Sequence, residues 1–406
     1  MKHCLPFDTL HEECGVFGIF GGQEIPPAQA AYYGLYALQH RGQESCGIAV
    51  SDRGVLSVHR AMGLVGEVFD DAVLSSLPGQ IAIGHVRYST AGGSLVQNCQ
   101  PLLMRYAKGR LAIAHNGNLT NAETVREELA KGGAIFQTTI DSEVIAHVIA
   151  QERLTAGSVE QAVVRMMGRI HGAYSLLVMS PQKLVAARDP FGFRPLVIGR
   201  LGSSYVIASE TCALDAVNAE FIRDVEPGEV VVVDAEGLRS IRAHCAEQPR
   251  RMCVFEYIYF ARPDSTLDGV RVHAARLRAG ALLAREHPAD ADIVIGVPDS
   301  GLDAAIGFAQ ESGIPFETGF VRNNYVGRTF IKPEQGEREA SINIKLNVLR
   351  QTVAGKRIVM VDDSIVRGST SANIIRALKK KCMCASPPRR STGPAISARI
   401  SPRAKS

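Results

Sequence analysis

The stretch HEECGVFGIF, residues 11–20, places a cysteine between two acidic residues and a short apolar run. The run from residue 14 to residue 20 predicts a buried strand that begins close to the N-terminus. Cys14 has two interpretations at this position. A lone cysteine is commonly a small buried core residue, but Cys14 would be an N-terminal nucleophile if residues 1–13 were removed.

Short apolar strands and a few helices alternate from this stretch to about residue 240. Further strands are predicted at 46–50, 81–84, 111–114, 175–179, 196–198 and 230–233. Helices are predicted at 121–131 and 141–153, where apolar residues recur with helical spacing. This pattern favours an α+β layered domain.

The pattern changes in the last third of the chain. Two apolar strands, IVIGV (293–297) and RIVMV (357–361), are each followed by a loop and an amphipathic helix. Such units predict an α/β domain with a parallel sheet, and ligands of these sheets bind beyond the carboxyl ends of the strands. We therefore expect one domain at 14–245 and a second at 246–381.

Composition narrows the class of protein. The 406 residues are 46% hydrophobic and 21% charged, as in soluble globular proteins. No run of 18 apolar residues predicts a membrane span, and the first residues lack the apolar segment of a secretion signal. The nine cysteines are scattered, which favours free thiols in a reducing cytoplasm.

The net charge of +4 is unevenly distributed. Residues 364–406 hold ten Lys and Arg and no Asp or Glu, so the first 363 residues hold 35 basic and 41 acidic groups, a net charge of −6. The body of the protein is thus mildly acidic and gives no reason to expect nucleic acid as a partner.

A set of residues in the first part suits attack on a carboxamide. The α-amine of a processed Cys14, with a pKa of about 7.7–8.0, could act as general base for its own thiol. Asn116 and Gly117, in HNGN, could donate to the developing oxyanion. Arg87 could bind the carboxylate of a glutamine-like substrate, and Asp141 its ammonium group.

Each of these residues also has a structural interpretation. HNGN is a common type of turn, and Asp141 could cap the N-terminus of the helix at 141–153. Arg87 could form a surface ion pair. The residues alone leave these alternatives open.

Several motifs occur in the order that they have in a known family, the N-terminal-nucleophile amidotransferases. The resemblance to the glutaminase domain of this family covers residues 14 to about 235. It rests on CGVFGI, YGLYALQHRGQESCGI, HVRYST, HNGN and DSE.

This resemblance implies roles for the residues above. Cys14 would be the nucleophile, Asn116 and Gly117 the oxyanion hole, and Arg87 and Asp141 the glutamine-binding residues. Residues 1–13 would be a propeptide.

The segment VMVDDSIVRGSTS (359–371) ends a strand with Asp362 and Asp363 and then opens a helix. Backbone N–H groups and hydroxyls at a helix N-terminus bind phosphate, and paired carboxylates suit ribose hydroxyls and Mg²⁺. The alternative is an acidic turn with a Ser or Thr helix cap. The segment resembles the phosphoribosyl-diphosphate signature of type I phosphoribosyltransferases.

The second resemblance implies a substrate site for phosphoribosyl diphosphate. Asp362 and Asp363 would hold Mg²⁺ together with Ser300 of GVPDSG. NNYVGRTFIKPEQGER (323–338) resembles the mobile loop of the family, in which Arg328 and Lys332 would stabilise the leaving diphosphate. The phosphate-binding residues would be Arg367, Gly368, Ser369, Thr370 and Ser371.

Together with EYIYFARPDS (256–265) between them, the two parts resemble the amidophosphoribosyltransferase family. This implies that ammonia from glutamine attacks phosphoribosyl diphosphate, giving 5-phosphoribosylamine, glutamate and diphosphate, the first committed step of purine synthesis. The resemblance also implies a closed passage for ammonia, purine nucleotides as feedback inhibitors and a homo-oligomer.

Cys253 is either a buried strand thiol or a metal ligand. The iron–sulfur branch of the family carries a ligand of a [4Fe–4S] cluster at this position, and such a cluster takes four thiolates. Only Cys382 and Cys384 lie beyond Cys253, so the ligand set is incomplete.

From Lys381 onward the resemblance ends, and the Pro-, Ser- and Arg-rich residues 382–406 are expected to be disordered. The codons of KCMCAS, read in another frame, permit VHVRIS, which resembles a strand of the family. A frameshift is therefore our hypothesis for this tail, and it would leave the second domain incomplete.

Two other functions are open at this point. The glutaminase part could serve a different sugar-phosphate aminating or amide-forming partner. Alternatively, a truncated chain could keep only glutaminase activity or a non-catalytic, nucleotide-binding regulatory role. Dependence of glutamine hydrolysis on phosphoribosyl diphosphate, and formation of 5-phosphoribosylamine, would separate these functions.

Overall fold

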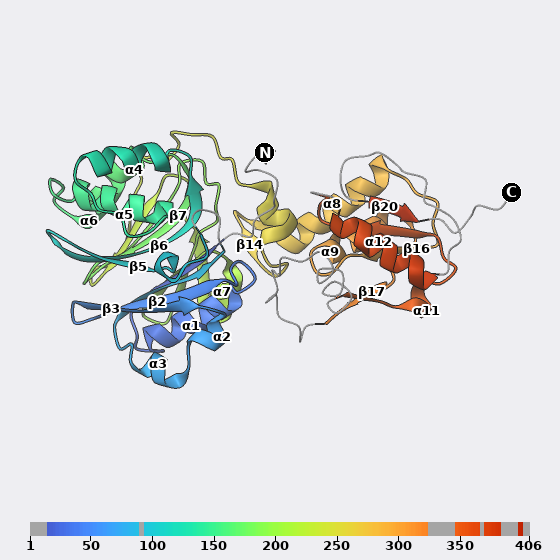
Figure 1. The fold of residues 1–406 in the computed structure, drawn as a ribbon, viewed down its shortest axis with the longest axis horizontal. Helices are drawn as coiled ribbons and strands as arrows, with labels where there is room; N and C mark the ends of the chain where they lie inside the picture. The colour runs from blue at the N-terminus through green and yellow to red at the C-terminus, as the bar shows by residue number, and fades with distance from the viewer. Residues whose placement is uncertain (1–13, 89–92, 324–345, 366–368, 383–396, 401–406) are drawn as a thin grey trace. The chain divides into compact units, whose positions relative to one another are not determined.

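The computed structural model describes residues 14–88, 93–323, 346–365, 369–382 and 397–400. They divide into two compact units, shown in Figure 1. The first unit contains residues 14–256 and 260–270, and the second contains residues 257–259 and the residues from 271 onward.

Two antiparallel sheets form the centre of the first unit. The seven-stranded sheet has the order β11 (Glu220–Asp224), β9 (Val197–Leu201), β10 (Ser204–Ala208), β1 (Gly15–Phe20), β4 (Ile81–Arg87), β2 (Ser45–Asp52) and β3 (Val55–Met62). The six-stranded sheet has the order β13 (Gly237–Ile241), β12 (Val230–Asp234), β8 (Leu184–Arg188), β7 (Gly172–Met179), β6 (Gly109–Leu119) and β5 (Leu102–Tyr106).

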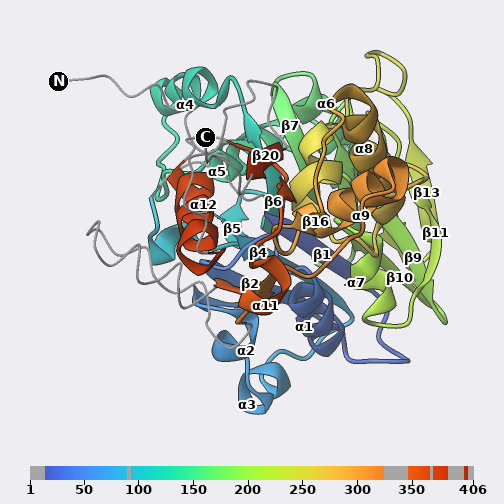
Figure 2. The ribbon, with the colours of Figure 1, turned by 90° about the vertical axis from the view of Figure 1, so that its right-hand side faces the viewer.

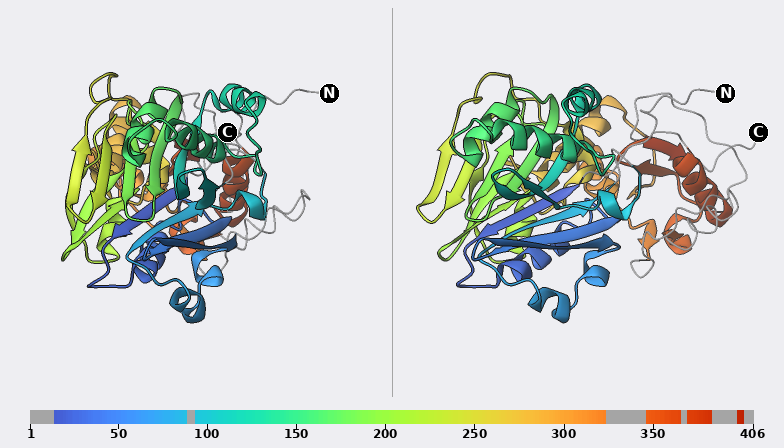
Figure 3. Two further views of the ribbon diagram at one scale, coloured as in Figure 1. Left: turned by 90° about the vertical axis from the view of Figure 1, so that its left-hand side faces the viewer. Right: turned by 60° about the vertical axis from the view of Figure 1, so that its left-hand side comes forward.

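Helices cover the outer face of each sheet, so that the unit has four layers (Figure 3). On the seven-stranded sheet lie α1 (Pro27–Ala37), α2 (Val65–Val68), α3 (Asp71–Ser75) and α7 (Thr211–Asp215). On the six-stranded sheet lie α4 (Ala122–Lys131), α5 (Asp141–Glu152) and α6 (Val159–Met167). A third apolar cluster fills the layer between the sheets. The expected α+β layered domain agrees with this arrangement.

The second unit is built around strands β16 (Ile293–Gly296) and β19 (Ile358–Val361), which pair in parallel as the sequence predicts. Helices α8 (Val272–Glu286) and α9 (Gly301–Ser312) cover one face, and α11 (Arg350–Val353) and α12 (Ser369–Cys382) cover the other. Figure 2 shows α9 and α12 on opposite sides of β16. A hairpin of β17 (Phe320–Arg322) and β18 (Leu346–Val348) adjoins this core.

The link between the units contains a π-helical turn, η2 (Glu256–Phe260), and the short strands β14 (Thr266–Leu267) and β15 (Val270–Arg271). A 3₁₀ turn, η1 (Val96–Asn98), lies in the first unit. Among the described residues, no helix is both long and apolar enough to cross a bilayer.

The end of the chain differs from the sequence prediction. Residues 397–400, expected to be disordered, form strand β20 (Ser397–Ile400), which pairs antiparallel with β19 and makes the sheet mixed. An edge strand presents unpaired N–H and C=O groups, and a short segment can satisfy them by pairing. The remainder of the tail, 383–396 and 401–406, lies outside the described residues.

Candidate active sites

The layer between the two sheets is apolar along most of its length and becomes polar at one end of the first unit. Side chains alternate between the faces of a strand, and the inward positions along most of each strand are apolar: Val16, Ala49, Ile83, Ala114 and Leu177. Continuing this alternation gives a group of polar inward positions, which we call the polar end: Cys14, Ser45, His85, Arg87, Asn116 and Ser175. The structure therefore gathers three of the predicted catalytic and binding residues at this end.

Cys14 lies immediately before β1 and is 5% exposed. Its Sγ donates a hydrogen bond to the main-chain oxygen of Tyr88, at 3.5 Å, and Tyr88 follows Arg87 in the chain. The main-chain oxygen of Cys14 accepts a hydrogen bond from Nε of Arg41, at 3.0 Å. The thiol is thus held beside the end of β4, where the predicted substrate-binding arginine lies.

Two structural features bear on the prediction that Asn116 and Gly117 form an oxyanion hole. The side chain of Asn116 is fully buried, and neither its Oδ1 nor its Nδ2 has a partner among the residues that the structure describes. Buried polar groups almost always have a partner, so an unpaired amide here indicates a place for a polar ligand. Gly117 has a φ of +151°, and a Cβ there would lie 2.0 Å from the main-chain oxygen of Ala173, which only glycine avoids.

Arg87 closes β4 and is 2% exposed. Its guanidinium forms an ion pair with the carboxylate of Glu44 and donates to the main-chain oxygen of Gly93, at 3.3 Å. A guanidinium that already binds one carboxylate has the planar geometry to bind a second. The role of Arg87 toward the glutamine carboxylate stays a prediction.

Asp141 is the first residue of α5 and is 7% exposed. Its Oδ2 accepts a hydrogen bond from the N–H of Leu119, at 2.9 Å, and its Oδ1 lies 3.6 Å from Nδ1 of His115. Burial alone would raise the pKa of Asp141, but His115 and the N–H groups of Leu119 and Ser142 outweigh burial and lower it. The side chain is therefore ionised, as binding of a substrate ammonium group requires.

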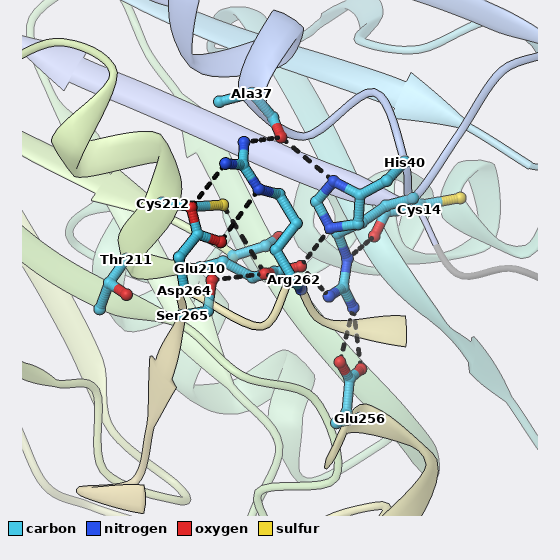
Figure 4. A network of polar contacts seen from close by, with 12 residues as sticks. Cys14, Ala37, His40, Glu210, Thr211, Cys212, Glu256, Arg262, Asp264 and Ser265 are labelled. Atoms are coloured by element: carbon cyan, nitrogen blue, oxygen red, sulfur yellow. Dashed lines mark hydrogen bonds and ion pairs between the residues drawn. The ribbon is translucent and has the colours of Figure 1, made fainter. Parts of the chain in front are cut away.

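A buried ion network that we did not predict is connected to Cys14 through Arg41. Besides its bond to Cys14, Arg41 donates from Nη1 to Glu210 Oε1, at 2.5 Å, and from Nη2 to both oxygens of Glu256, at 2.8 and 3.0 Å. All three side chains are fully buried, and Figure 4 shows the network. Arg41 stands inside a motif used above, but its partners follow 169 and 215 residues later in the chain.

Glu210 is the centre of this network. It also accepts hydrogen bonds from His40 Nε2 at 2.8 Å, Ser265 Oγ at 2.7 Å and the N–H of Arg262 at 2.9 Å (Figure 4). Burial alone would raise the pKa of Glu210, but His40, Arg41 and the hydrogen bonds lower it far below its usual range. Glu210 is thereby held as a carboxylate that pairs with Arg41, the residue that binds the Cys14 carbonyl.

In the second unit, the predicted metal-binding residues lie together at the carboxyl end of β19. Ser300 Oγ donates to Asp363 Oδ2, and the N–H of Asp363 donates to Asp362 Oδ1, at 3.0 Å. Burial, and then the charge of Asp363, raise the pKa of Asp362 to about 7. A Cβ on Gly301 would lie 2.8 Å from the main-chain oxygen of Val361, so the glycine lets the start of α9 approach the carboxylates closely.

Comparison with known proteins identifies the family. A family model described as a glutamine amidotransferase domain matches residues 85–216. The amidophosphoribosyltransferase of Bacillus subtilis is 50% identical over 372 residues, which cover 91% of this chain and 77% of that protein. The chain belongs to the amidophosphoribosyltransferase family. The amidophosphoribosyltransferase of Methanocaldococcus jannaschii is 47% identical to this chain, and the match covers 90% of this chain and 81% of that protein.

Solved structures agree with this family. The Bacillus subtilis glutamine phosphoribosylpyrophosphate amidotransferase, in complex with ADP and GMP, is 48% identical and covers 91% of this chain and 79% of its own, with a TM-score of 0.84. A structure described as the allosteric regulatory enzyme of purine biosynthesis is 49% identical and also has a TM-score of 0.84. The protein is therefore an enzyme, an amidophosphoribosyltransferase, and it acts at the first step of purine biosynthesis.

Some residues that we assigned to this family's second site are not described. Arg328, Lys332, Arg367 and Gly368 lie outside the described residues. Ser369 and Thr370 begin α12, but the positions of their side chains are not described. Ser371, in the first turn of α12, is 8% exposed.

The described residues do not supply the ligands of an iron–sulfur cluster. Cys253 is half-buried and lies in irregular chain before η2, so the interpretation as a buried strand thiol is wrong; its N–H donates to the main-chain oxygen of Phe193, at 3.2 Å. Within the described ranges, no three His, Cys, Asp or Glu side chains are placed to hold one metal ion. The side chain of Cys382 and all of Cys384 fall outside these ranges, so no step of the reaction is assigned to a cluster.

Proposed function

We propose that Cys14 performs the glutamine hydrolysis of this amidophosphoribosyltransferase, with the polar end as its active site. The observation that carries the proposal is the buried amide of Asn116, which has no hydrogen-bond partner in the described part of the chain, next to Gly117, where any side chain would collide with the main chain of Ala173. Such an arrangement costs folding free energy unless a ligand uses it. Strain and unsatisfied groups of this kind concentrate at functional sites.

The chemistry follows from the positions of these groups. After residues 1–13 are removed, the α-amine of Cys14 takes the thiol proton, and the thiolate attacks the carboxamide carbon of glutamine. Asn116 Nδ2 and the N–H of Gly117 stabilise the oxyanion. The intermediate expels ammonia with a proton from the α-ammonium, and water then hydrolyses the thioester to give glutamate and the free thiol.

Arg87 and Asp141 orient the substrate for this attack. The guanidinium of Arg87 binds the α-carboxylate of glutamine alongside Glu44, and the ionised Asp141 binds its α-ammonium. Two charged contacts on one end of the substrate fix the direction in which its amide points.

We propose that the second unit binds phosphoribosyl diphosphate at the carboxyl end of β19. Burial, and then the neighbouring charge of Asp363, raise the pKa of Asp362. A bound cation would offset both effects by stabilising the ionised pair of carboxylates. Asp362, Asp363 and Ser300 would hold Mg²⁺, which neutralises charge on the diphosphate when it is bound. Residues 367–371 would bind the 5-phosphate, and Arg328 and Lys332 the leaving diphosphate.

Further parts of the proposal follow the family. The domain limits would be 1–13 for the propeptide, 14–245 for the glutaminase and 246–381 for the phosphoribosyltransferase. Because the Bacillus subtilis relative was solved with ADP and GMP, we propose that purine nucleotides also regulate this chain. We further propose that it works in the cytoplasm as a homo-oligomer.

Separate assays of the two half-reactions test this function. Replacing Asn116 by Ala should lower kcat for glutamine hydrolysis about 10²- to 10³-fold, the usual effect of removing one oxyanion donor. Release of diphosphate from phosphoribosyl diphosphate with an ammonium salt should stay within about twofold, because that step uses the second unit. Unchanged glutamine hydrolysis in Asn116→Ala would refute the assignment of this site.

A further inference from the structure

On one side, the main chain of His115, just before the proposed oxyanion residues, has no strand partner among the residues that the structure describes. Strand β5 begins at Leu102, which pairs with Ile113 of β6, so β5 does not extend to His115. Two side chains take the place of the strand. The N–H of His115 donates to Gln100 Oε1, at 2.9 Å, and its C=O accepts from His85 Nε2, also at 2.9 Å.

Both side chains are buried and come from different parts of the unit. His85 is fully buried on β4 in the facing sheet, and Gln100 is 4% exposed just before β5. The bond from His85 therefore crosses the layer between the two sheets at its polar end. The two bonds hold both main-chain groups of one residue, His115.

The hydrogen-bond partner of His85 determines which ring nitrogen carries the proton. A carbonyl oxygen can only accept, so the proton must be on Nε2. Burial, with a smaller effect from the nearby charge of Arg87, lowers the pKa of His85 to about 3, although its bond to the main chain of His115 opposes this. The ring is thus a neutral donor at neutral pH. Its Nδ1 has no partner among the described atoms.

The clamped peptide leads directly into the oxyanion site. The C=O of His115 and the N–H of Asn116 belong to one rigid peptide plane. No hydrogen bond within the described residues fixes the Asn116 side chain, and Gly117 beyond it is the most flexible residue type. The position of the amide in the site therefore depends on the main chain that carries it.

We propose that Gln100 and His85 form a clamp on His115 that positions Asn116 and Gly117 for the transition state of glutamine hydrolysis. The inference rests on the proposed glutaminase site. Neither residue needs to touch glutamine, so both are positioning residues. Because Arg87 and Asp141 bind the α-carboxylate and α-ammonium groups of glutamine, away from the reacting amide, loosening the clamp should affect kcat and leave KM nearly unchanged.

The test uses the full chain with three clamp variants. His85→Gln keeps an N–H near the place of Nε2, His85→Leu removes it, and Gln100→Met removes the acceptor. A misplacement of about 1 Å can cost about 10²-fold in rate, so we expect His85→Leu and Gln100→Met to lower kcat for glutaminase at least about tenfold. KM for glutamine should change less than about twofold, and His85→Gln should recover most of the loss.

A matched control separates positioning from general destabilisation. Ser51, also buried on β2, donates from Oγ to the main-chain oxygen of Pro181, at 2.7 Å, away from the polar end. Ser51→Ala removes one buried side-chain to main-chain bond and should leave kcat unchanged. The rate at which iodoacetamide alkylates Cys14 should also be unchanged in His85→Leu, because the clamp does not touch the thiol.

Combination with Asn116→Ala decides the mechanism. If the clamp acts through the oxyanion donors, His85→Leu should lower kcat less in the Asn116→Ala background than in the wild type, because only the N–H of Gly117 is left for the clamp to position. The clamp is refuted if His85→Leu lowers kcat as much in Asn116→Ala as it does in the wild type, or if His85→Leu and Gln100→Met both keep wild-type kcat. Either result leaves the proposed glutaminase site unaffected. If Asn116→Ala alone keeps wild-type kcat, the site itself is wrong and the clamp with it. Should His85→Leu fail to fold, Gln100→Met in the same cycle gives the answer.

Discussion

Replacing Arg41 by Met tests the buried ion network that binds the Cys14 carbonyl. The change removes the donor to the Cys14 carbonyl and leaves the carboxylates of Glu210 and Glu256 without their shared guanidinium. Breaking a buried ion pair by removing one partner costs about 3–5 kcal/mol, because a buried charge is left uncompensated.

The remaining partners set the magnitude within this range. Glu210 keeps the hydrogen bonds of His40, Ser265 and the N–H of Arg262, and Glu256 keeps Nη1 of Arg194 at 3.3 Å. We therefore expect a loss near the lower end, about 3 kcal/mol in the free energy of unfolding.

The pH dependence has a definite sign. The pKa of Glu210 is lowered in the folded protein, so its pairing stabilises the fold above the ordinary pKa of Glu, about 4.3, and is lost as the pH falls through the lower folded value. In Arg41→Met the same carboxylate is less compensated and protonates at higher pH. The stability difference between the two proteins should thus be largest at neutral pH and narrow on acidification.

Calorimetric or urea unfolding of the full chain measures this difference. The chain has no tryptophan, so circular dichroism is the more direct optical signal. Arg242→Met, which removes an exposed pair with Glu226 in the same unit, is the control and should change stability by less than about 1 kcal/mol. Equal effects of the two substitutions, or an Arg41→Met difference that grows on acidification, would refute the reasoning.

Three further predictions concern the two sites. Gly117→Ala places a methyl group against the main-chain oxygen of Ala173 and should lower both the unfolding temperature and kcat for glutaminase; an unchanged melting curve would contradict this. Asp141→Asn removes a charged contact worth about 1.5–3 kcal/mol and should raise KM for glutamine at least about tenfold, with no change in ammonium-supported diphosphate release. Substituting Asn for both Asp362 and Asp363 should abolish the Mg²⁺-dependent release of diphosphate while basal glutamine hydrolysis persists, and parallel loss of both activities would argue against separate sites.

The local pattern of apolar residues was enough to predict individual strands, because strand formation depends largely on neighbouring residues. The apolar run after Cys14 is β1, and the run before Asp362 is β19. Alternation along strands accounts for the positions of Arg87 and Asn116 at the same end of the unit as Cys14, but the expectation that they share a site came from the family resemblance. Spacing within a strand is visible in sequence because the side-chain period is fixed by backbone geometry.

Long-range pairing could not be predicted in the same way. The bonds of Arg41 to Glu210 and Glu256 join residues 169 and 215 positions apart, and each partner alone resembles an ordinary surface charge. His85 is similar, because its role depends on where β5 begins in the other sheet. Strand β20 depends on the free edge of β19, which the composition of the tail does not reveal.

Labelling with a reactive glutamine analogue, such as a diazoketone, tests the central claim most directly. Mass spectrometry of the digested protein locates the covalent adduct and the first residue of the mature chain. The account predicts one adduct, on the thiol of Cys14, in a peptide that begins at that residue. An adduct on another cysteine, or a fully active protein that retains residues 1–13, would contradict it.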